Sequence, residues 1–586
     1  MRRPPTIAIV NRLIETIRSS VIGANTVVAG PFGPRQITYA DYTASGKPLR
    51  FIEEYLQQVV LPLYANTHSE TSYTGAQTSH LREEARALIK RCLGGTDEEH
   101  AVIFCGSGST GAIDKLITIL GIRIPSVLED RYRLSASVTD RPVVFVGPYE
   151  HHSNELPWLE SVADVVEIRE DDDGHIDLKH LEEALSHYGD RLKIGSFSAA
   201  SNVTGITSDT SAISSLLHQH GALSFWDFAA AAPYVAVEMR SPHTDGNDYK
   251  DAVFVSPHKF IGGPQTPGVL CVRRELLHNR VPSVPGGGTV SYVSSFDHHY
   301  LRDQEHREEG GTPAIIESIR AGLVFQLKEA VGPQEIRRRE HAFIERAIAS
   351  WRLDSNIRIL GNPDAERLSI VSFNIRAPVR SLLHHEFVVA LLNDLFGIQA
   401  RGGCACAGPY GHRLLGIDDE TSRAVDIEVE KGFEIIKPGW ERVNFNYFIS
   451  EKEFDYIVQA VHLIATDGWR LLPRYTLDVH TGAWRHKEVS PGLESLSDIS
   501  YEQAIMTYPA INRSGKSEQF ATYLDEARTI LTGPMPPADL VELPPSVEAL
   551  RWFPLPHEVG GSLREPVGPP SVERWGEGTA AAEPLG

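Results

Sequence analysis

Short β-rich runs alternate with longer amphipathic stretches between about residues 100 and 325, and this alternation constrains the fold more than any other feature of the chain. Six runs are predicted as strands: 101–104, 142–146, 165–168, 193–197, 222–226 and 252–255. The stretches 178–187 and 209–220, which lie between them, have helical spacing. We therefore expect an α/β fold with a mostly parallel sheet between helices, whose ligands bind beyond the carboxyl ends of the strands.

The rest of the chain divides into flanking segments. Residues 1–90, which include an irregular stretch rich in Gly, Thr, Ser and Tyr at 64–78, are predicted to contribute to the active site and to a small domain. Residues 91–330 are predicted to form the large domain. Strand and helix patterns in 331–480, among them a strand-like run at 442–449, indicate a smaller α+β domain. Residues 481–586 are interpreted as a C-terminal extension, of which the last 25 or so residues, rich in Gly, Pro, Glu and Ala, are expected to be disordered.

The net charge argues against two classes of partner, and the cysteine content indicates a location. The formal net charge of −21 argues against binding to nucleic acid or to an anionic membrane surface. The sequence contains no run of eighteen apolar residues, so we expect no membrane-spanning helix. Five cysteines without framework spacing fit a reducing compartment, so the cytoplasm is the expected location.

A Gly/Ser-rich loop, 106–112, follows the first of these strands and is expected to open a helix at about Ala112. Small residues let an anion approach the backbone, and the positive helix end favours a phosphate, with Ser109 and Thr110 as further donors. The loop lacks the Lys-Ser/Thr ending of a Walker motif. Taken alone, a loop of this kind is more often an ordinary turn than a phosphate site.

Lys259 directly follows the predicted strand 252–255 and precedes a Gly-Gly-Pro turn. An amine held in a desolvated pocket is what a carbonyl cofactor requires. Asp227 ends another strand, where a carboxylate can pair with a protonated pyridine nitrogen, although a helix cap is the ordinary alternative.

Several ordered motifs together resemble the class V aminotransferase family of fold type I enzymes, which use pyridoxal 5′-phosphate (PLP). Their order and spacing are similar to those of the cysteine desulfurase branch, which also contains selenocysteine lyases and the amino-terminal part of molybdenum-cofactor sulfurases. The resemblance covers about residues 37 to 465. It rests on Gly108-Ser109-Thr110, Glu150-His151-His152-Ser153-Asn154, Ser201-Asn202, Asp227, Ser256-x-His258-Lys259 and Gly310-Gly311-Thr312-Pro313.

The resemblance implies a role for each matching residue. Lys259 would form the Schiff base with PLP and move the substrate's α-proton, and His151 would stack on the cofactor ring. Asn202 would bind the phenolic oxygen and Asp227 the ring nitrogen. The residues implied to hold the phosphate are Ser109, Thr110, Ser256 and His258, with Thr312 reaching the phosphate of a second subunit in a homodimer. The chain departs from the family at Ala230, where a Gln near the phenolic oxygen is usual.

The loop 401–409 (Arg-Gly-Gly-Cys-Ala-Cys-Ala-Gly-Pro) determines which reaction is expected. A thiol in a mobile, electropositive loop is a plausible nucleophile. By resemblance to the desulfurase loop the nucleophile is Cys406, and Cys404 stands where some relatives have His. Two alternatives remain open: a metal site made with His412, and a buried, inert pair of cysteines.

Arg442 resembles the family's arginine that binds the substrate carboxylate, a task that suits a bidentate guanidinium. We therefore expect a cysteine desulfurase that converts L-cysteine to L-alanine, leaves a persulfide on Cys406 and passes sulfur to an acceptor protein. Another class V reaction (C–S lyase, epimerase, kynureninase-like or aminotransferase) and a non-catalytic, PLP-bearing sulfur-relay or scaffold protein are the alternatives.

Overall fold

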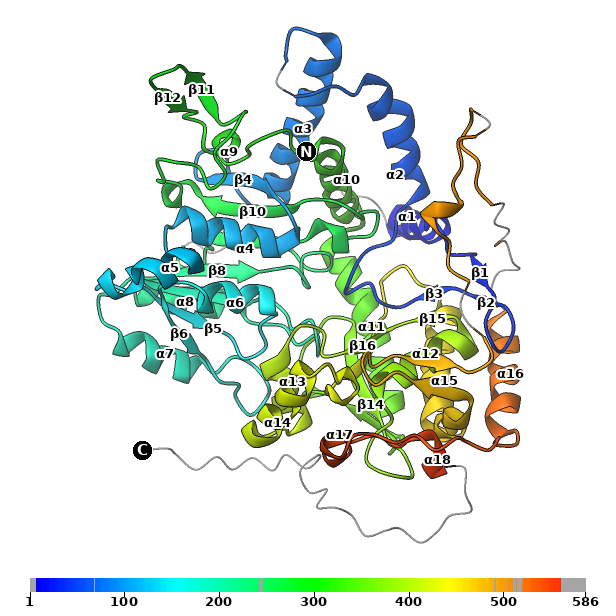
Figure 1. Ribbon diagram of the computed structural model, residues 1–586. Coiled ribbons are helices and arrows are strands. Elements are labelled where there is room, and N and C mark those ends of the chain that lie inside the picture. The colour runs from blue at the N-terminus through cyan, green and yellow to red at the C-terminus, as the bar shows by residue number, and fades with distance from the viewer. Residues whose placement is uncertain are drawn as a thin grey trace.

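A seven-stranded sheet forms the centre of the protein (Figure 1). The structure, a computed structural model, describes residues 7–559 except 68, 242–245, 490–491, 503, 510–512 and 514–518. The strand order is β4-β10-β9-β8-β7-β5-β6, and only β10 runs antiparallel to its neighbours. The strands are β4 (His100–Cys105), β5 (Val143–Val146), β6 (Asp164–Glu167), β7 (Lys193–Ser198), β8 (Ala222–Asp227), β9 (Ala252–Val255) and β10 (Gly268–Arg273).

Both faces of this sheet are buried, which explains the continuous apolar runs of its strands. Along β9, Val253 and Val255 belong to one hydrophobic core, while Ala252 and Phe254 belong to a second core on the opposite face. The helices of the first face are α3 (Tyr73–Cys92), α7 (Leu178–His187), α8 (Thr210–Gln219) and α10 (Ile315–Val331). The second face is covered by α4 (Gly108–Ile119) and α6 (Leu156–Leu159).

A four-stranded antiparallel sheet, in the order β13-β14-β17-β16, forms the smaller α+β part. Its strands are β13 (Ile357–Ile359), β14 (Ile370–Ile375), β16 (Arg401–Gly403) and β17 (Trp440–Asn444). The helices of this part of the chain are α11 (Pro333–Trp351), α12 (His385–Phe396), α13 (Gly408–Leu415), α14 (Asp419–Glu430) and α15 (Glu451–Asp467). The N-terminal strand β3 (Thr38–Tyr39) pairs with β15 (Ile398–Gln399), so the start of the chain joins this part.

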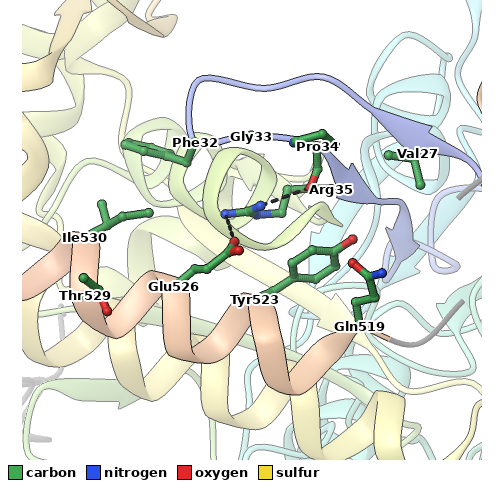
Figure 2. Close-up of a pocket in the computed structure, with 10 residues that line it drawn as sticks. All are labelled: Val27, Phe32, Gly33, Pro34, Arg35, Gln519, Tyr523, Glu526, Thr529 and Ile530. Atoms are coloured by element: carbon green, nitrogen blue, oxygen red, sulfur yellow. Dashed lines mark hydrogen bonds and ion pairs between the residues drawn. The ribbon is translucent and has the colours of Figure 1, made fainter. Parts of the chain in front are cut away.

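The C-terminal segment folds back onto the smaller part. The ring of Trp552 stacks on His384 with centroids 5.2 Å apart. Figure 2 shows helix α16 (Phe520–Thr532) beside strand β2 (Arg35–Gln36), where Arg35 pairs with Glu526 at 3.0 Å. The other elements of this segment are β18 (Tyr475–Leu477), β19 (Trp484–His486), α17 (Pro545–Leu550) and α18 (Pro556–Val559). Residues 560–586, for which disorder was expected, lie outside the described residues.

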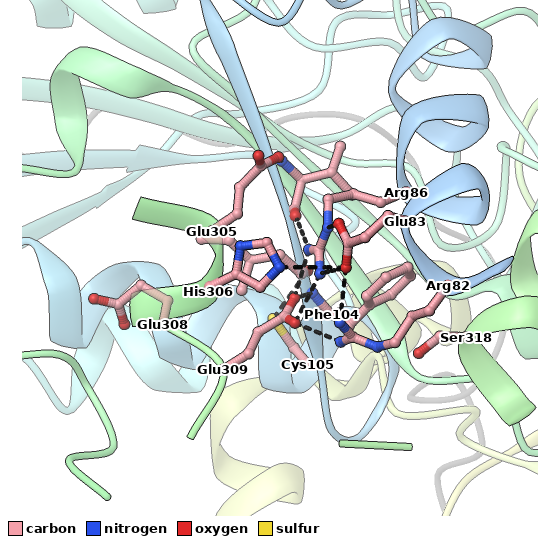
Figure 3. A network of polar contacts seen from close by, with 12 residues as sticks. Arg82, Glu83, Arg86, Phe104, Cys105, Glu305, His306, Glu308, Glu309 and Ser318 are labelled. Carbon is pink, nitrogen blue, oxygen red and sulfur yellow. Dashed lines mark hydrogen bonds and ion pairs between the residues drawn. The ribbon is translucent and has the colours of Figure 1, made fainter. Parts of the chain in front are cut away.

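A network of buried charges covers the free edge of β4 (Figure 3). Two carboxylates accept hydrogen bonds of 2.7 Å from backbone N–H groups of this edge strand: Glu305 from Val102, and Glu309 from Phe104. Glu305 belongs to the short helix α9 (Gln304–Arg307), and Glu309 follows it. Glu309 also pairs with Arg82 and Arg86 of α3. These side chains occupy backbone N–H groups with which an eighth strand would otherwise pair.

The remaining α-helices and strands lie at the periphery or near the N-terminus. They are α1 (Ile7–Ser20), β1 (Val27–Val28), α2 (Arg50–Tyr55), α5 (Ser126–Tyr132), β11 (Val290–Val293) and β12 (His298–Tyr300). None of the helices in the described ranges combines the length and the apolar character that crossing a bilayer requires.

The predicted strands are confirmed, with four differences in detail. Strand β10 was not predicted. Helix α4 begins at Gly108 rather than near Ala112, because the N–H of Ser109 is satisfied by the Ser256 hydroxyl. The strand expected over 442–449 ends at Asn444. The region 64–78, expected to be irregular, is helical from Tyr73.

Candidate active site

Lys259 lies at the carboxyl end of β9, in a short 3₁₀ turn (Pro257–Lys259). It lines a cavity of about 280 Å³ at the edge where the parallel strands end. Burial lowers the pKa of Lys259 to about 8; Asp227 opposes this shift, while Arg442 and Arg401 add to it. Within the described residues no hydrogen bond or ion pair engages the Lys259 amine. A buried, unpartnered amine of lowered pKa is suited to attack a carbonyl group.

The N-terminus of α4 forms one wall of the same cavity, through Ser107, Gly108, Ser109 and Thr110. Gly108 has a φ of +55°, and a Cβ there would lie 2.9 Å from both the Ser256 hydroxyl and His258 Cε1. The backbone therefore approaches these side chains as closely as glycine allows. The hydroxyl groups and the positive end of the helix dipole together fit a phosphate.

Two titratable groups expected beside the cofactor ring also line the cavity. Burial and the charge of Lys259 lower the pKa of His151 to about 3, so its ring is neutral near pH 7. Burial raises the pKa of Asp227, although Oδ1 accepts the N–H of Ala229 at 2.8 Å and Lys259 favours the carboxylate. Ala230 belongs to the same lining. A flat neutral ring and a buried carboxyl group are compatible with a pyridine ring between them.

Arg442, on β17, provides a buried guanidinium on another side of the cavity. Its Nη2 pairs with Asp41 at 3.0 Å, its Nη1 donates to the carbonyl of Asn202 at 2.8 Å, and its Nε has no hydrogen-bond partner. Asp41 also accepts from Arg401 Nε at 3.1 Å. Two guanidinium groups thus share one carboxylate at the cavity, an arrangement suited to an anionic substrate.

Residues 404–407 form a tight turn that carries the two cysteines. The N–H of Ala407 donates to the carbonyl of Cys404 at 3.2 Å, and Ala405 and Cys406 both have a left-handed φ, +48° and +56°. Both thiols are exposed, which contradicts the alternative of a buried, inert pair. Cys406 lines the cavity and Cys404 does not.

Hydrogen bonds attach this turn to the large domain. Asn202 Nδ2 donates to the carbonyl of Ala405 at 2.8 Å, and the N–H of His152 donates to the carbonyl of Cys406 at 2.9 Å. The ring of His152 accepts the N–H of Gly408 at 3.0 Å. Asn202, expected at the phenolic oxygen, is therefore committed to the turn in this structure.

Sequence reasoning did not single out Asp41, His152 or Arg401 as members of the site. Asp41 lies between aromatic residues without a motif of its own, and it is 360 residues from Arg401 in the chain. The pairing of β3 with β15 brings the two together, and the N–H of Asn444 also donates to the carbonyl of Ala40. The adjacent pair His151-His152 offered a signal for His152, because both side chains follow a strand end.

Thr312 is exposed and is not part of the cavity lining. Its hydroxyl accepts from Asn66 Nδ2 at 3.3 Å. The metal alternative finds no support, because the described residues contain no group of three or more metal-ligating side chains. The ring of His412 instead contacts the hydroxyl of Ser422 at 3.2 Å.

Comparison with known proteins identifies the family. Residues 38–424, about two thirds of the chain, match the class V aminotransferase family. The chain belongs to that family. Class V aminotransferases and the related desulfurases are PLP-dependent enzymes, and the Lys259 amine, the α4 cradle and the Asp227–His151 pair fit this cofactor.

Within the class V aminotransferases, the similar curated proteins are described as probable cysteine desulfurases. Those of Halalkalibacterium halodurans and Streptomyces coelicolor are each 27% identical over 64% of this chain and 84% of their own length. Among solved structures, the apo cysteine desulfurase of Thermococcus onnurineus NA1 superposes with a TM-score of 0.61 at 22% identity, covering 80% of this chain and 99% of its own. The Escherichia coli cysteine desulfurase CsdA gives 0.56 at 21% identity, covering 72% and 93%.

Proposed function

We propose that the protein is a cysteine desulfurase that converts L-cysteine to L-alanine and keeps the released sulfur as a persulfide on Cys406. The observation that carries the proposal is that Cys406, Lys259 and Arg442 line one cavity. A thiol, an amine of lowered pKa and a carboxylate-binding cation are the three groups that the reaction needs. The similarity to probable cysteine desulfurases supports the same conclusion.

The cofactor would be held by residues that already line the cavity. Ser109, Thr110, Ser256 and His258 are assigned to the phosphate, His151 and Asp227 to the ring, and Lys259 to the aldehyde carbon. Bound there, PLP withdraws electrons from the substrate's α-carbon. Because His151 is neutral near pH 7, it covers the ring without adding positive charge.

The chain's own residues then perform binding, proton transfer and sulfur removal. Arg442, whose Nε has no partner in the structure, binds the substrate carboxylate. The Lys259 amine removes the α-proton, which its lowered pKa of about 8 allows near neutral pH. The Cys406 thiolate attacks the substrate sulfur, the C–S bond breaks, and its electron pair remains with the carbon. That carbon is protonated and leaves as alanine, while the sulfur stays as Cys406–S–SH.

The purified holoenzyme tests this proposal directly. With L-cysteine and dithiothreitol it should release alanine and sulfide in equal amounts, and Cys406→Ser should abolish both. A Cys406→Ser enzyme that still makes alanine at the wild-type rate would refute the proposed nucleophile. Cys92→Ser, at the end of α3 and away from the cavity, is the matched control.

A second reaction of the family is favoured by one observation, the Ala230 that lines the cavity where a Gln is usual. A changed environment of the ring oxygen suits another class V reaction, such as C–S bond cleavage to pyruvate. Product analysis separates the two, because pyruvate and ammonia in place of alanine would favour the lyase.

Assembly and location complete the proposal. We propose a homodimer in which the exposed Thr312 reaches the phosphate of the second subunit, and a protein acceptor for the persulfide sulfur. All five cysteines are free, which suits the reducing cytoplasm. Light scattering at micromolar concentration would give the mass of one chain if the dimer proposal is wrong.

A further inference from the structure

Two thiols occupy the first and third positions of the turn 404–407. A β-turn keeps the Cα atoms of its first and fourth residues within about 7 Å, so Cys404 and Cys406 are attached to one compact piece of backbone. Both thiols are exposed, yet only Cys406 is part of the cavity lining. The turn therefore carries one thiol in the wall of the cavity and one outside it.

The hydrogen bonds of the turn maintain this difference. Those from Asn202 and His152 hold the carbonyls of Ala405 and Cys406, and His152 also holds the N–H of Gly408. The backbone is thus fixed on the side of Cys406. Within the described residues the Cys404 thiol has no hydrogen-bond partner, so it is free to turn toward its neighbour.

We infer that Cys404 is a second sulfur carrier, which takes the sulfur from the Cys406 persulfide and presents it outside the cavity. This inference rests on the proposed function. The Cys404 thiolate attacks the outer sulfur of Cys406–S–SH, and a new S–S bond forms as the old one breaks. The electron pair of the broken bond returns to Cys406 as a thiolate. The exchange has no net oxidation or reduction and needs no further reactant.

The position of Cys406 suits this direction of transfer. Arg442 and Cys406 line the same cavity, so the Cys406 thiolate is released into a cavity that also holds a guanidinium. The transfer also restores the nucleophile at the place where the next substrate binds. Attack on the inner sulfur would instead release sulfide and close a disulfide across the three residues of a tight turn, and the enzyme would then need a reductant before its next cycle.

The size of the sulfur acceptor provides the test. Dithiothreitol is small compared with a cavity of about 280 Å³, whereas a thiol attached to dextran reaches a thiol outside the cavity more readily than one that lines it. We compare sulfide release to both acceptors in wild-type holoenzyme, Cys404→Ser and the control Cys92→Ser. Cys404→Ser is expected to make its first equivalent of alanine and to turn over with dithiothreitol, but to lose at least about tenfold in rate with the dextran thiol, because exchange depends on access to the persulfide.

Peptide mapping after one turnover with L-[³⁴S]cysteine gives a second readout. The label is expected first on Cys406 and then on Cys404, and in Cys404→Ser it should remain on Cys406. Equal rates with the dextran thiol, or a label that never reaches Cys404, would overturn the relay alone. A Cys404–Cys406 disulfide formed together with free sulfide would also overturn it. Absence of the alanine burst in the wild type would refute the proposed function itself, and the relay with it.

Discussion

The side-chain amide of Asn202 donates a hydrogen bond of 2.8 Å to the carbonyl oxygen of Ala405. It thereby joins the cavity wall that follows β7 to the turn that carries Cys406. Ala405 and Cys406 both have a left-handed φ, a conformation that costs L-residues roughly 1–2 kcal/mol each. The hydrogen bonds to their carbonyls help to offset that cost, so the position of the thiol depends on the large domain.

Asn202→Ala should loosen this turn. Loss of a hydrogen bond worth about 1 kcal/mol corresponds to roughly a fivefold change in the population of the bound turn. We expect the rate of alanine formation to fall about fivefold and alkylation of Cys406 by iodoacetamide to become faster. PLP absorbance must be matched between proteins, so that cofactor loss is not mistaken for loop release. Asn393→Ala, at the exposed end of α12, serves as control, and unchanged alkylation of Asn202→Ala would contradict the role of this bond.

Lys259 should make the stability of the PLP-free protein depend on pH. Its pKa is about 8 in the fold against 10.5 in the unfolded chain, so its buried charge opposes folding at and below pH 8. Between pH 8 and 10.5 the unfolded chain binds more protons, and stability therefore rises with pH. Lys259→Met should be more stable than wild type at pH 7 by about 1–3 kcal/mol, and this advantage should vanish above pH 10.5.

Urea unfolding of both proteins from pH 7 to 10.5 measures this difference. The buried Lys250 and Lys328 also have pKa values of about 8, but they are present in both proteins and cancel in the comparison. A difference that stays constant across this range would mean that the fold does not lower the pKa of Lys259.

Ala230→Gln should change the electronic environment of bound PLP. A hydrogen-bond donor at this position would stabilise the negative charge on the phenolic oxygen of the cofactor. That oxygen would then stabilise a proton on the nitrogen of Lys259 less well, and the pKa of this nitrogen would fall. We expect the pH midpoint of the long-wavelength absorption of the holoenzyme to shift to lower pH. Ala229→Gln, one residue away, tests whether bulk alone causes the shift. An unchanged midpoint would mean that residue 230 does not approach the ring oxygen.

Glu309→Gln should destabilise the large domain. The two guanidinium groups of Arg82 and Arg86 lower the pKa of Glu309 to about 2, and removal of its charge would leave them buried without a full partner. Such a loss costs about 3–5 kcal/mol. Because the carboxylate stabilises the fold above its unfolded pKa of 4.5, the difference should narrow as the pH falls from 4.5 toward 2.

The unfolding midpoint in urea at several pH values measures this effect. Glu345→Gln, on the exposed side of α11, is the matched control and should change stability little. Equal losses for the two variants would show that the network contributes no more than a surface pair.

Local sequence patterns predicted much of the fold, and the exceptions have physical causes. The predicted strands and helix α7 follow from apolar runs and helical spacing. Strand β10 was missed because the Lys259 turn, not a helix, joins it to β9, which breaks the strand–helix alternation. The ion pairs of Asp41 were not predictable, since the pairing of β3 with β15 gives no local signal.

In the candidate site too, features with a local sequence pattern were predictable and features that depend on long-range contacts were not. Lys259, Asp227 and the α4 loop were predictable because each follows a strand that ends at one edge of the sheet. The family resemblance pointed to Cys406, but no local pattern shows which cysteine faces the cavity, because this depends on two left-handed residues and on carbonyl contacts with His152 and Asn202.

The carboxylates along β4 also bear on how the protein avoids self-association. An edge strand with free N–H groups is a template on which a strand of another molecule can add. Here Glu305 and Glu309 already occupy the N–H groups of Val102 and Phe104. An incoming strand would have to displace buried carboxylates from their arginine and lysine partners before it could pair. The charges that fix the edge of the sheet therefore also protect it against aggregation.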